Sequence, residues 1–280
     1  MTQVPLKQNK KPSLIIEPEE LAPRLEQENL LIIDLCNPQV YQQLHVPGAV
    51  HLMPQQLMSG VQPAAGKLPS LAQLETLFQQ LGYTEDKFIV VYDDEGGGWA
   101  GRFIWTLDMI GHQNYAYLNG GVHAWLKEGH PVEKVINQPE PTSISLTLDD
   151  STENSARADR DYILANLDNP QVQIWDARSP EEYRGERVLA RRGGHIPGAI
   201  NFEWTQAMDS ARNYRIREDL QPVLLDLGLN VDHEVITHCQ SHHRSGFAYL
   251  VAKMLGFRRV KAYDGSWSEW GNLSHTPVEQ

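Results

Sequence analysis

Cysteine is scarce in this sequence, and so are long apolar stretches and positive charge. The chain has 2 cysteines among 280 residues, Cys36 and Cys239, too few for a disulfide framework in a chain of this size. No apolar run approaches the roughly 20 residues that a membrane-spanning helix needs, and the polar N-terminus lacks the apolar centre of a secretory signal. These absences predict a cytoplasmic protein that does not bind a membrane.

Acidic side chains outnumber basic ones. With 36 Asp and Glu against 24 Lys and Arg, the formal net charge is −12, and neither half of the chain is basic. Proteins that bind nucleic acid need a basic surface, so a nucleic-acid partner is not expected. The cations are concentrated locally instead, at Arg184, Arg187, Arg191, Arg192 and again at Arg244. This distribution favours a small anion as the ligand.

The sequence contains one pattern twice. Four segments of the first half recur in the same order 142 to 150 residues further on. The pairs are LIIDLCNP (31–38) with QIWDARSP (173–180), HVPGAVHL (45–52) with HIPGAINF (195–202), KFIVVYDDEGGGWAG (87–101) with HEVITHCQSHHRSG (233–246), and YLNGGVHAWLKEGHPVE (117–133) with AYDGSWSEWGNLSHTPVE (262–279). A period this long indicates duplicated domains. We expect one domain over 12–133, a polar linker over 134–159 with room for a short strand at 143–148, and a second domain over 160–280.

Each copy alternates short apolar runs with helical patterns. In the second copy, 172–175 and 234–237 have the character of buried strands. Helical spacing then relates the apolar residues Phe247, Leu250, Val251, Met254 and Leu255, and Gly256 follows as a C-cap residue. Such alternation predicts an α/β fold: two tandem domains, each a mainly parallel sheet with helices on both faces.

The loop after 234–237 carries the chemistry. Cys239 directly follows a predicted strand and precedes a helix that begins near Ser245. Unpaired backbone N–H groups at a helix N-terminus bind anions and favour a thiolate over a thiol, and nearby cations add to the effect. His242, His243 and Arg244 supply such cations. The loop is therefore interpreted as an activated sulfur nucleophile in an anion cradle, in preference to a buried core cysteine.

The remaining cysteine and the first copy provide contrasts. Cys36 ends an apolar run without cationic neighbours, so core packing is the better interpretation. At the position of Cys239 the first copy has Asp93, followed by an acidic, glycine-rich loop that is one residue longer. Arg102 does not replace Arg244 there, because it lies beyond Gly101, the counterpart of Gly246. We therefore predict that the first domain is catalytically silent.

The motifs WDARSPEEY, GGHIPGAINF, YDGSW and HCQSHHRS resemble the tandem-domain rhodaneses, or thiosulfate sulfurtransferases, over nearly the whole chain. The loop is similar to the bacterial type with Cys-Gln-Thr-His-His-Arg-Ser, with Ser241 in place of threonine. The resemblance implies that the Cys239 thiolate takes the outer sulfur of thiosulfate as a persulfide and passes it to a thiophile, cyanide or a thiol. It needs no cofactor, and we expect a monomer.

The resemblance also implies roles for the loop residues. The backbone N–H groups of Gln240, Ser241, His242, His243 and Ser245 would hold the anion, and Arg244 would bind the sulfonate end of thiosulfate. Adjacent histidine side chains cannot both point at the sulfur, so which of His242 and His243 contacts substrate stays open. Metal ligation is not expected, because no further His or Cys is spaced to complete a site.

One position departs from the family. Several mammalian-type members carry a substrate arginine where this chain has Glu182. Arg178 is expected to form a structural pair with a carboxylate. For Arg187, Arg191 and Arg192, a solvated face is a better interpretation than the pocket.

Three alternatives remain. Members that prefer 3-mercaptopyruvate have small neutral loop residues, whereas this loop is bulky and cationic. Cysteine phosphatases and arsenate reductases have one residue more between cysteine and arginine than the four here. A non-catalytic binding module is disfavoured by the intact cysteine loop.

Overall fold

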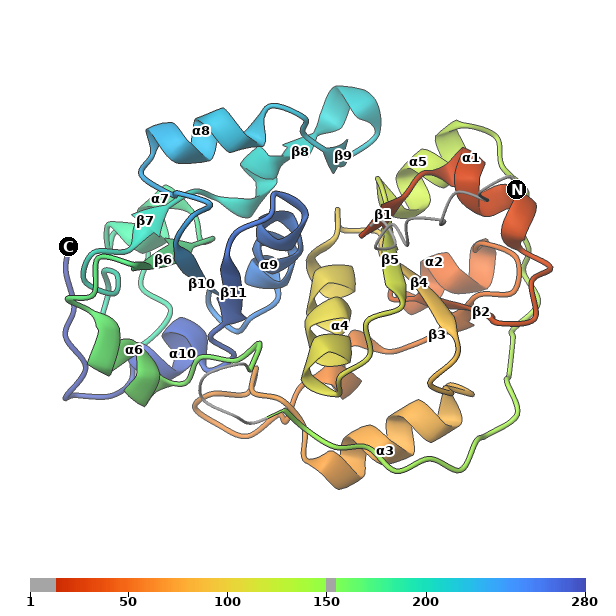
Figure 1. The fold of residues 1–280 in the computed structure, drawn as a ribbon, viewed down its shortest axis with the longest axis horizontal. Coiled ribbons are helices and arrows are strands. Elements are labelled where there is room, and N and C mark those ends of the chain that lie inside the picture. Colours follow the sequence, from red (N-terminus) through yellow and green to blue (C-terminus); the bar gives the residue numbers. More distant parts are fainter. Residues whose placement is uncertain (1–13, 150–154) are drawn as a thin grey trace, which may run out of the picture.

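The computed structural model describes residues 14–149 and 155–280 and consists of two α/β domains side by side (Figure 1). The predicted start of the first domain at Pro12 and part of the predicted linker lie outside the described residues. The two described halves follow the duplicated sequence, with each half built around its own parallel sheet. The predicted fold class is confirmed.

The first domain contains a five-stranded parallel sheet in the order β1-β5-β4-β2-β3. Its strands are β1 (Ile15–Ile16), β2 (Leu30–Asp34), β3 (Val50–His51), β4 (Phe88–Tyr92) and β5 (Tyr115–Leu118). Its helices are α1 (Pro18–Leu21), α2 (Pro38–Gln43), α3 (Leu71–Gln80), α4 (Gly98–Met109) and α5 (Gly121–Lys127), with 3-10 turns η1 (Ala22–Arg24) and η2 (Pro54–Leu57).

The second domain contains a four-stranded parallel sheet in the order β11-β10-β6-β7, and a small antiparallel pair, β8 and β9. Its strands are β6 (Val172–Asp176), β7 (Ile200–Asn201), β8 (Met208–Asp209), β9 (Arg215–Ile216), β10 (Glu234–His238) and β11 (Arg259–Ala262). Its helices are α6 (Arg160–Asn166), α7 (Pro180–Tyr183), α8 (Leu220–Asp226), α9 (Arg244–Met254) and α10 (Ser266–Trp270), with 3-10 turns η3 (Trp204–Ala207) and η4 (Ser210–Arg212).

Burial on both sheet faces explains why the central strands are continuous apolar runs. Along β4, Ile89 and Val91 belong to one buried cluster, whereas Val90 and Tyr92 belong to another on the opposite face. Successive side chains of a strand point to opposite faces, so a sheet covered on both sides needs apolar residues at every position. The predicted strands of the second copy form as β6 and β10.

The two copies repeat the same local contacts. The His45 ring stacks on Tyr41 with centroids 3.9 Å apart, and the His195 ring stacks on Tyr183 with centroids 3.7 Å apart. Each histidine also pairs through its backbone with a residue near the end of its copy, Glu133 or Glu279. The recurrence of His-x-Pro-Gly-Ala in the sequence therefore reflects one structural unit used twice.

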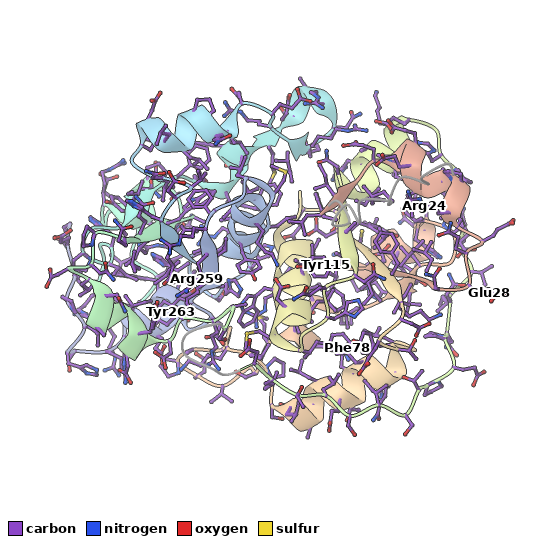
Figure 2. The ribbon with its side chains drawn as sticks, viewed as in Figure 1. Arg24, Glu28, Phe78, Tyr115, Arg259 and Tyr263 are labelled. Atoms are coloured by element: carbon purple, nitrogen blue, oxygen red, sulfur yellow. The ribbon has the colours of Figure 1, made fainter. Side chains whose placement is uncertain are left out.

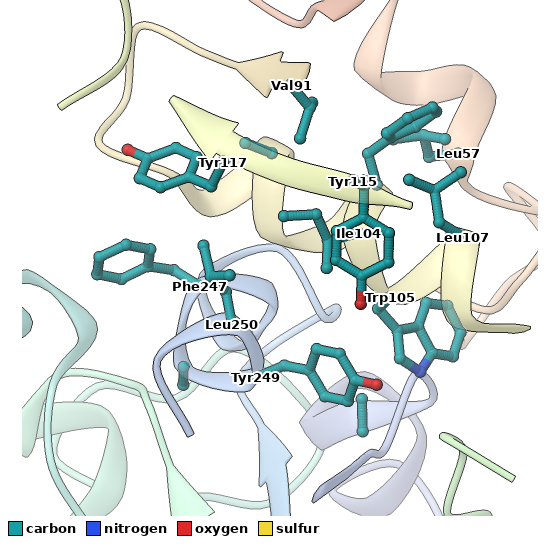
Figure 3. Close-up of a cluster of buried hydrophobic side chains, with 14 of the residues drawn as sticks. Leu57, Val91, Ile104, Trp105, Leu107, Tyr115, Tyr117, Phe247, Tyr249 and Leu250 are labelled. Atoms are coloured by element: carbon teal, nitrogen blue, oxygen red, sulfur yellow. The ribbon is translucent and has the colours of Figure 1, made fainter. Parts of the chain in front are cut away.

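The domains join through α4 and α9, which lie between the two sheets (Figure 1). The helices cross at Gly101 and Gly246, where a Cβ on either residue would overlap the backbone of the other helix. Around this crossing, one buried cluster extends through both domains, and Ile104 and Tyr117 lie opposite Phe247 and Leu250 (Figure 3). The inner faces of both sheets thus share a single apolar core.

A polar network lies at one end of the interface between α4 and α9, which we call the seam. The Nζ of Lys253 on α9 donates to the hydroxyl of Tyr115 at 2.7 Å and to Asp108 at 2.5 Å, and the Tyr249 hydroxyl donates to Asp108 at 2.6 Å. Tyr115 is labelled among the other side chains in Figure 2 and lies close to Tyr249 in Figure 3. The seam is therefore apolar at its centre and ion-paired at this end.

The short strand for which the sequence leaves room at 143–148 does not form. The segment from 134 to 149 contains no helix or strand and runs along α3. There Gln79 donates to the carbonyl of Ile144 at 3.0 Å, and the N–H of Leu146 donates to Glu75 at 3.0 Å. The side chains of α3 satisfy backbone groups that a strand would have paired with a neighbour, so the expectation of a strand was wrong.

Gly101→Ala should destabilise the protein, because its methyl group would push α4 away from the backbone of α9. Overpacking of this kind typically costs about 1–3 kcal/mol in the free energy of unfolding. Urea denaturation measures the change. Thr76→Ala on the exposed face of α3 is the control and should change stability by less than about 0.5 kcal/mol. Equal stabilities for the two variants would contradict a close helix crossing.

Candidate functional site

The loop from Cys239 to His243 lies at the carboxyl edge of the second sheet. Every residue of β10 is buried, and its last residue, His238, pairs in register with Asp176 at the end of β6. The helix α9 begins at Arg244, so the chain reverses direction within five residues of the strand. Parallel α/β sheets place ligands at this edge, where strand ends and helix starts converge.

The Cys239 sulfur is surrounded by hydrogen-bond donors. The residue is 1% exposed, and the Ser245 hydroxyl donates to Sγ at 3.5 Å. Burial opposes ionisation most strongly, but the Arg244 charge and hydrogen bonds from Ser245 and from the backbone of Ser241 outweigh it and hold the pKa of the Cys239 thiol below its usual value. These contacts favour the thiolate, the form of cysteine that acts as a nucleophile.

The sulfur occupies the place of a helix cap. No side chain caps the N-terminus of α9, whereas Asp159 caps α6 and Ser70 caps α3 in the ordinary way. An uncapped first turn leaves backbone N–H groups without partners and carries a partial positive charge. The amides of Ser241 and Ser245 direct their hydrogen bonds at Cys239 instead. An anion on the sulfur is thus bound by the helix itself.

The first domain shows the same cradle filled by a carboxylate. Asp93 is fully buried, and its side chain accepts hydrogen bonds from the N–H groups of Glu95 at 3.1 Å, Gly97 at 2.7 Å and Ala100 at 2.9 Å. Ala100 is the counterpart of Ser245, since Gly101 matches Gly246. The cradle of the first domain is therefore closed by a fixed carboxylate and has no nucleophile, as the sequence comparison indicated.

Arg244 is held by Glu182. The guanidinium donates from Nη1 to Oε2 of Glu182 at 2.6 Å and from Nη2 to Oε1 at 2.9 Å. Burial acts against its charge, but the bonds to Glu182 and the nearby Cys239 raise the pKa of Arg244 above its usual value. A planar, bidentate pair fixes orientation as well as charge. Glu182 thus takes the position of the substrate arginine of mammalian-type members and orients Arg244.

A second ion pair supports the strand ends beside the loop. Arg178 donates from Nη2 to Asp176 at 2.6 Å and lies over the Trp267 ring, with Cζ 4.4 Å from its centroid. The predicted structural pairing of Arg178 with a carboxylate is confirmed. Burial lowers the pKa of His238 to about 4, even though its Nε2 lies 3.4 Å from Asp176. His238 is therefore uncharged at neutral pH.

The adjacent histidines point in different directions. His242 is fully buried in a left-handed backbone conformation, φ 57°, with Nδ1 2.8 Å from the Ser245 hydroxyl and its ring packed edge-on against Trp105. His243 is partly exposed and stacks on Trp99 with ring centroids 4.2 Å apart, and its Nε2 lies 3.0 Å from Glu95. Of these two histidines, His242 is buried and His243 is partly exposed to solvent.

The rest of the loop is held through its backbone and through Gln240. The carbonyl of Gln240 accepts from the N–H of Ser268 at 3.0 Å, and its side-chain amide donates to the carbonyl of Leu189 at 3.1 Å. A Cβ at Gly66, in the first domain, would overlap the carbonyl of Ser241. Both domains therefore contact the loop directly.

The remaining candidates lie apart from the sulfur. Arg187 and Arg191 are exposed. Arg192 donates to carbonyl oxygens near the C-terminus, those of Thr276 at 2.7 Å and Trp270 at 2.9 Å. Cys36 is fully buried, and burial, followed by the charge of Asp34, raises the pKa of its thiol far above the usual value. Its predicted place in the core is confirmed.

A hollow in the described residues lies elsewhere. Its volume is about 1170 Å³, and its lining includes Asp108, Tyr115 and Lys253 near the carboxyl ends of α4 and α9, away from Cys239. It contains no thiol. In residues 14–149 and 155–280, no group of three His, Cys, Asp or Glu side chains has the geometry to hold a metal ion, and no helix is long and apolar enough to cross a membrane.

Comparison with known proteins agrees with this geometry. The rhodanese-like domain family matches the chain twice, over residues 17–128 and 159–273. The chain belongs to the rhodanese family. Thiosulfate sulfurtransferases of Pseudomonas aeruginosa and Azotobacter vinelandii are each 53% identical over 266 residues, which is 95% of this chain and 97% of theirs. A solved 3-mercaptopyruvate sulfotransferase, SseA from Escherichia coli, is 25% identical with a TM-score of 0.80, covering 91% of this chain and 99% of that one.

Three features of this rhodanese were not anticipated from its sequence. Glu182 was recognised as a departure from the family but not as the partner of Arg244. Trp99 and Glu95 of the first domain contact His243, and the Ser266 hydroxyl accepts from the N–H of Cys239 at 3.4 Å. The only signal in the sequence was the YDGSW motif, which contains Ser266.

The rhodanese should react with iodoacetamide at Cys239 and not at Cys36 while it is folded. Because the Cys239 pKa is lowered, the thiolate persists to lower pH, and the rate should reach half its maximum below pH of about 8.5. Ser245→Ala removes one donor and should move this midpoint upward. Peptide mass spectrometry across a pH series measures both. A midpoint at or above that of a free cysteine in wild type, or no movement in the variant, would contradict this view of the cradle.

Proposed function

We propose that this protein transfers sulfane sulfur from thiosulfate to a thiophilic acceptor through a persulfide on Cys239. The observation that carries the proposal is the position of the sulfur, which receives the backbone and hydroxyl hydrogen bonds that a helix N-terminus offers to an anion. The two relatives that are 53% identical over almost their whole length are thiosulfate sulfurtransferases. The sequence-based prediction of that activity is supported by both.

In the first half-reaction, the Cys239 thiolate attacks the outer sulfur of thiosulfate. A bond forms between Sγ and this sulfur, the sulfur–sulfur bond of thiosulfate breaks, and sulfite leaves with the bonding electron pair. The enzyme keeps a persulfide anion, so one negative charge is present at the site before and after the step. Donors fixed in the cradle stabilise this charge without having to reorganise during the reaction.

In the second half-reaction, an acceptor such as cyanide or a thiolate attacks the terminal sulfur of the persulfide. The new bond forms as the bond to Sγ breaks, and Cys239 regains its thiolate. This is covalent catalysis by double displacement, in which one group carries the sulfur between two substrates. No cofactor is required, because the electrons of each broken bond stay with the leaving sulfur.

Arg244 binds the sulfonate end of thiosulfate in this proposal. Its pairing with Glu182 leaves it partly exposed, and the fixed guanidinium also interacts with the Cys239 charge. Gln240 to His243 make a loop with a bulky, polar lining, which suits an inorganic anion better than the organic chain of 3-mercaptopyruvate. The amides of Ser241 and Ser245 hold the transferred sulfur, while His243 borders the entrance.

The domains have separate tasks. We assign the silent role to 12–133 and catalysis to 160–280, joined by 134–159. The first domain shapes the site from outside, through Gly66, Trp99 and Glu95. We further propose a monomer that acts in the cytoplasm, since two domains in one chain supply both sides of the site and the two cysteines remain free thiols.

Intact mass before and after thiosulfate tests the proposal directly. The wild-type protein should gain the mass of one sulfur atom and lose it again on addition of cyanide. Cys239→Ala should gain nothing, and Cys36→Ala is the matched control that should behave as wild type. No gain in folded wild type would remove thiosulfate as the donor, and the same measurement with 3-mercaptopyruvate and with phosphate esters would then be decisive.

Arg244→Lys keeps the charge but loses the two-pronged bond to Glu182. We expect kcat/KM for thiosulfate to fall roughly 10- to 100-fold, the size expected from losing a charge-assisted hydrogen bond of about 1.5–3 kcal/mol. Arg217→Lys is the control, because Arg217 makes a similar bidentate pair with Asp219 on the surface. A loss of the same size in both variants would contradict a role for Arg244 at the site.

A further inference from the structure

One buried arginine near the loop lacks the carboxylate partner that the other arginines have. The pairs are Arg244 with Glu182 (2.6 Å), Arg178 with Asp176 (2.6 Å) and Arg157 with Asp264 (3.2 Å), and the carboxylate of Glu95 lies 3.0 Å from His243. Arg102 is the arginine that is left, because within residues 14–149 and 155–280 it forms no ion pair.

Arg102 belongs to α4 of the silent domain and is fully buried. Its Nη2 donates to the carbonyl of Leu57 at 2.7 Å, and its Cζ lies 4.6 Å from the centroid of the Trp105 ring. Nε and Nη1 have no hydrogen-bond partner. Burial lowers the pKa of Arg102 to about 10, so the guanidinium is still charged at neutral pH. A charged group with orphaned donors is costly to bury unless an anion compensates it.

The helix crossing places Arg102 against the catalytic loop. It follows Gly101, and a Cβ at Gly246 of α9 would lie 2.5 Å from the Arg102 backbone nitrogen. Trp105, which carries the guanidinium on its ring, also contacts the buried His242 ring, with centroids 4.6 Å apart. The Arg102 backbone thus lies beside the start of α9, and the anionic groups whose charges raise the pKa of Arg102 are Asp264 and then Cys239.

The duplicated sequence supplies an internal comparison. The counterpart of Arg102 in the second copy is Phe247, the residue after Gly246. The Phe247 ring covers the first-domain loop that contains Asp93, because a Cβ at Gly97 of that loop would lie 2.5 Å from the ring. The two equivalent positions therefore differ in charge: a cation faces the loop that contains the thiol, and an aromatic ring faces the loop that contains Asp93.

We propose that Arg102 is the counter-charge of the anionic sulfur on Cys239 and is a positioning residue supplied by the silent domain. Where it concerns the persulfide, this rests on the proposed function. The thiolate and the persulfide each carry one negative charge, and one permanent buried cation matches both. The silent domain then contributes to catalysis through its charge as well as its shape.

Other charged and titratable groups face the sulfur, and each is already engaged. Arg244 is shared with Glu182, and Asp264 also accepts a hydrogen bond from the N–H of Leu68 at 2.9 Å. His238 is uncharged at neutral pH, and burial lowers the pKa of His242 well below its usual value. The charge of Arg244 lowers the pKa of the Cys239 thiol, and in this proposal Arg102 is the second cation that acts on it.

The test is the pH dependence of Cys239 alkylation by iodoacetamide in Arg102→Met and Arg102→Lys. In Arg102→Met the midpoint should move upward, so that the rate below the midpoint falls about threefold while the rate at high pH is unchanged. Arg102→Lys keeps the charge and should restore the wild-type midpoint. Arg217→Met, on the surface, is the control. An unchanged midpoint, or a rate lowered equally at every pH, would overturn the proposal in favour of simple packing.

A double-mutant cycle provides an independent measurement. Above the thiol midpoint, Arg102→Met should cost more stability in the Cys239 protein than in Cys239→Ala, by about threefold in the ratio of folded to unfolded protein, and the difference should vanish below the midpoint. No coupling at any pH would overturn the proposal. Should Arg102→Met not fold, Arg102→Gln removes the charge and keeps donors. Neither experiment needs a sulfur donor, so a failure of sulfur transfer is distinguished from a failure of this inference.

Discussion

The site depends on placing hydrogen-bond donors and positive charge around a sulfur atom that is almost completely buried. Burial raises the pKa of a thiol, as it does at Cys36. The lowered pKa of Cys239 requires donors that are fixed before any substrate arrives. An α9 N-terminus without a side-chain cap, a serine hydroxyl and an oriented arginine supply them. The parallel sheet matters because it sets a strand end and a helix start at the same point.

The two domains show how one cradle serves two purposes. In the first, Asp93 completes the helix start with a carboxylate and the loop is closed. In the second, a sulfur takes the same position, and the first turn of α9 holds it as the other turn holds Asp93. The two loops differ in length by one residue, and the position that holds a carboxylate in one holds a thiol in the other. The first domain is therefore a structural reference for the second.

The seam between the domains connects stability to the site. Gly101 and Gly246 allow α4 and α9 to touch, and the apolar cluster on both sides makes a single core. The same close crossing brings residues of the first domain, among them Arg102 and Trp105, to the base of the catalytic loop. The packing that joins the domains thus also places charged groups near the sulfur. Domain packing and the electrostatics of the site therefore cannot be altered separately.

Much of this organisation was accessible from the sequence. The duplication, the parallel α/β class, the strands at 172–175 and 234–237 and the position of Cys239 between strand and helix follow from local periodicity and from motifs within single segments. The core position of Cys36 and the pairing of Arg178 also followed from near neighbours. These features are set by residues close together in the chain, for which spacing is a sufficient guide.

Other features were decided by tertiary structure alone. Glu182 and Arg244 are 62 residues apart in the chain, and Trp105 and His242 belong to different domains. The segment at 143–148 has the composition of a strand, yet α3 satisfies its backbone and no strand forms. Charge compensation and burial depend on which groups are in contact in the folded protein. Composition and spacing along the chain do not specify those contacts. The sequence by itself determined that Cys239 lies between a strand and a helix start, because local periodicity sets both, and only the packing of the two domains decided which charges surround it.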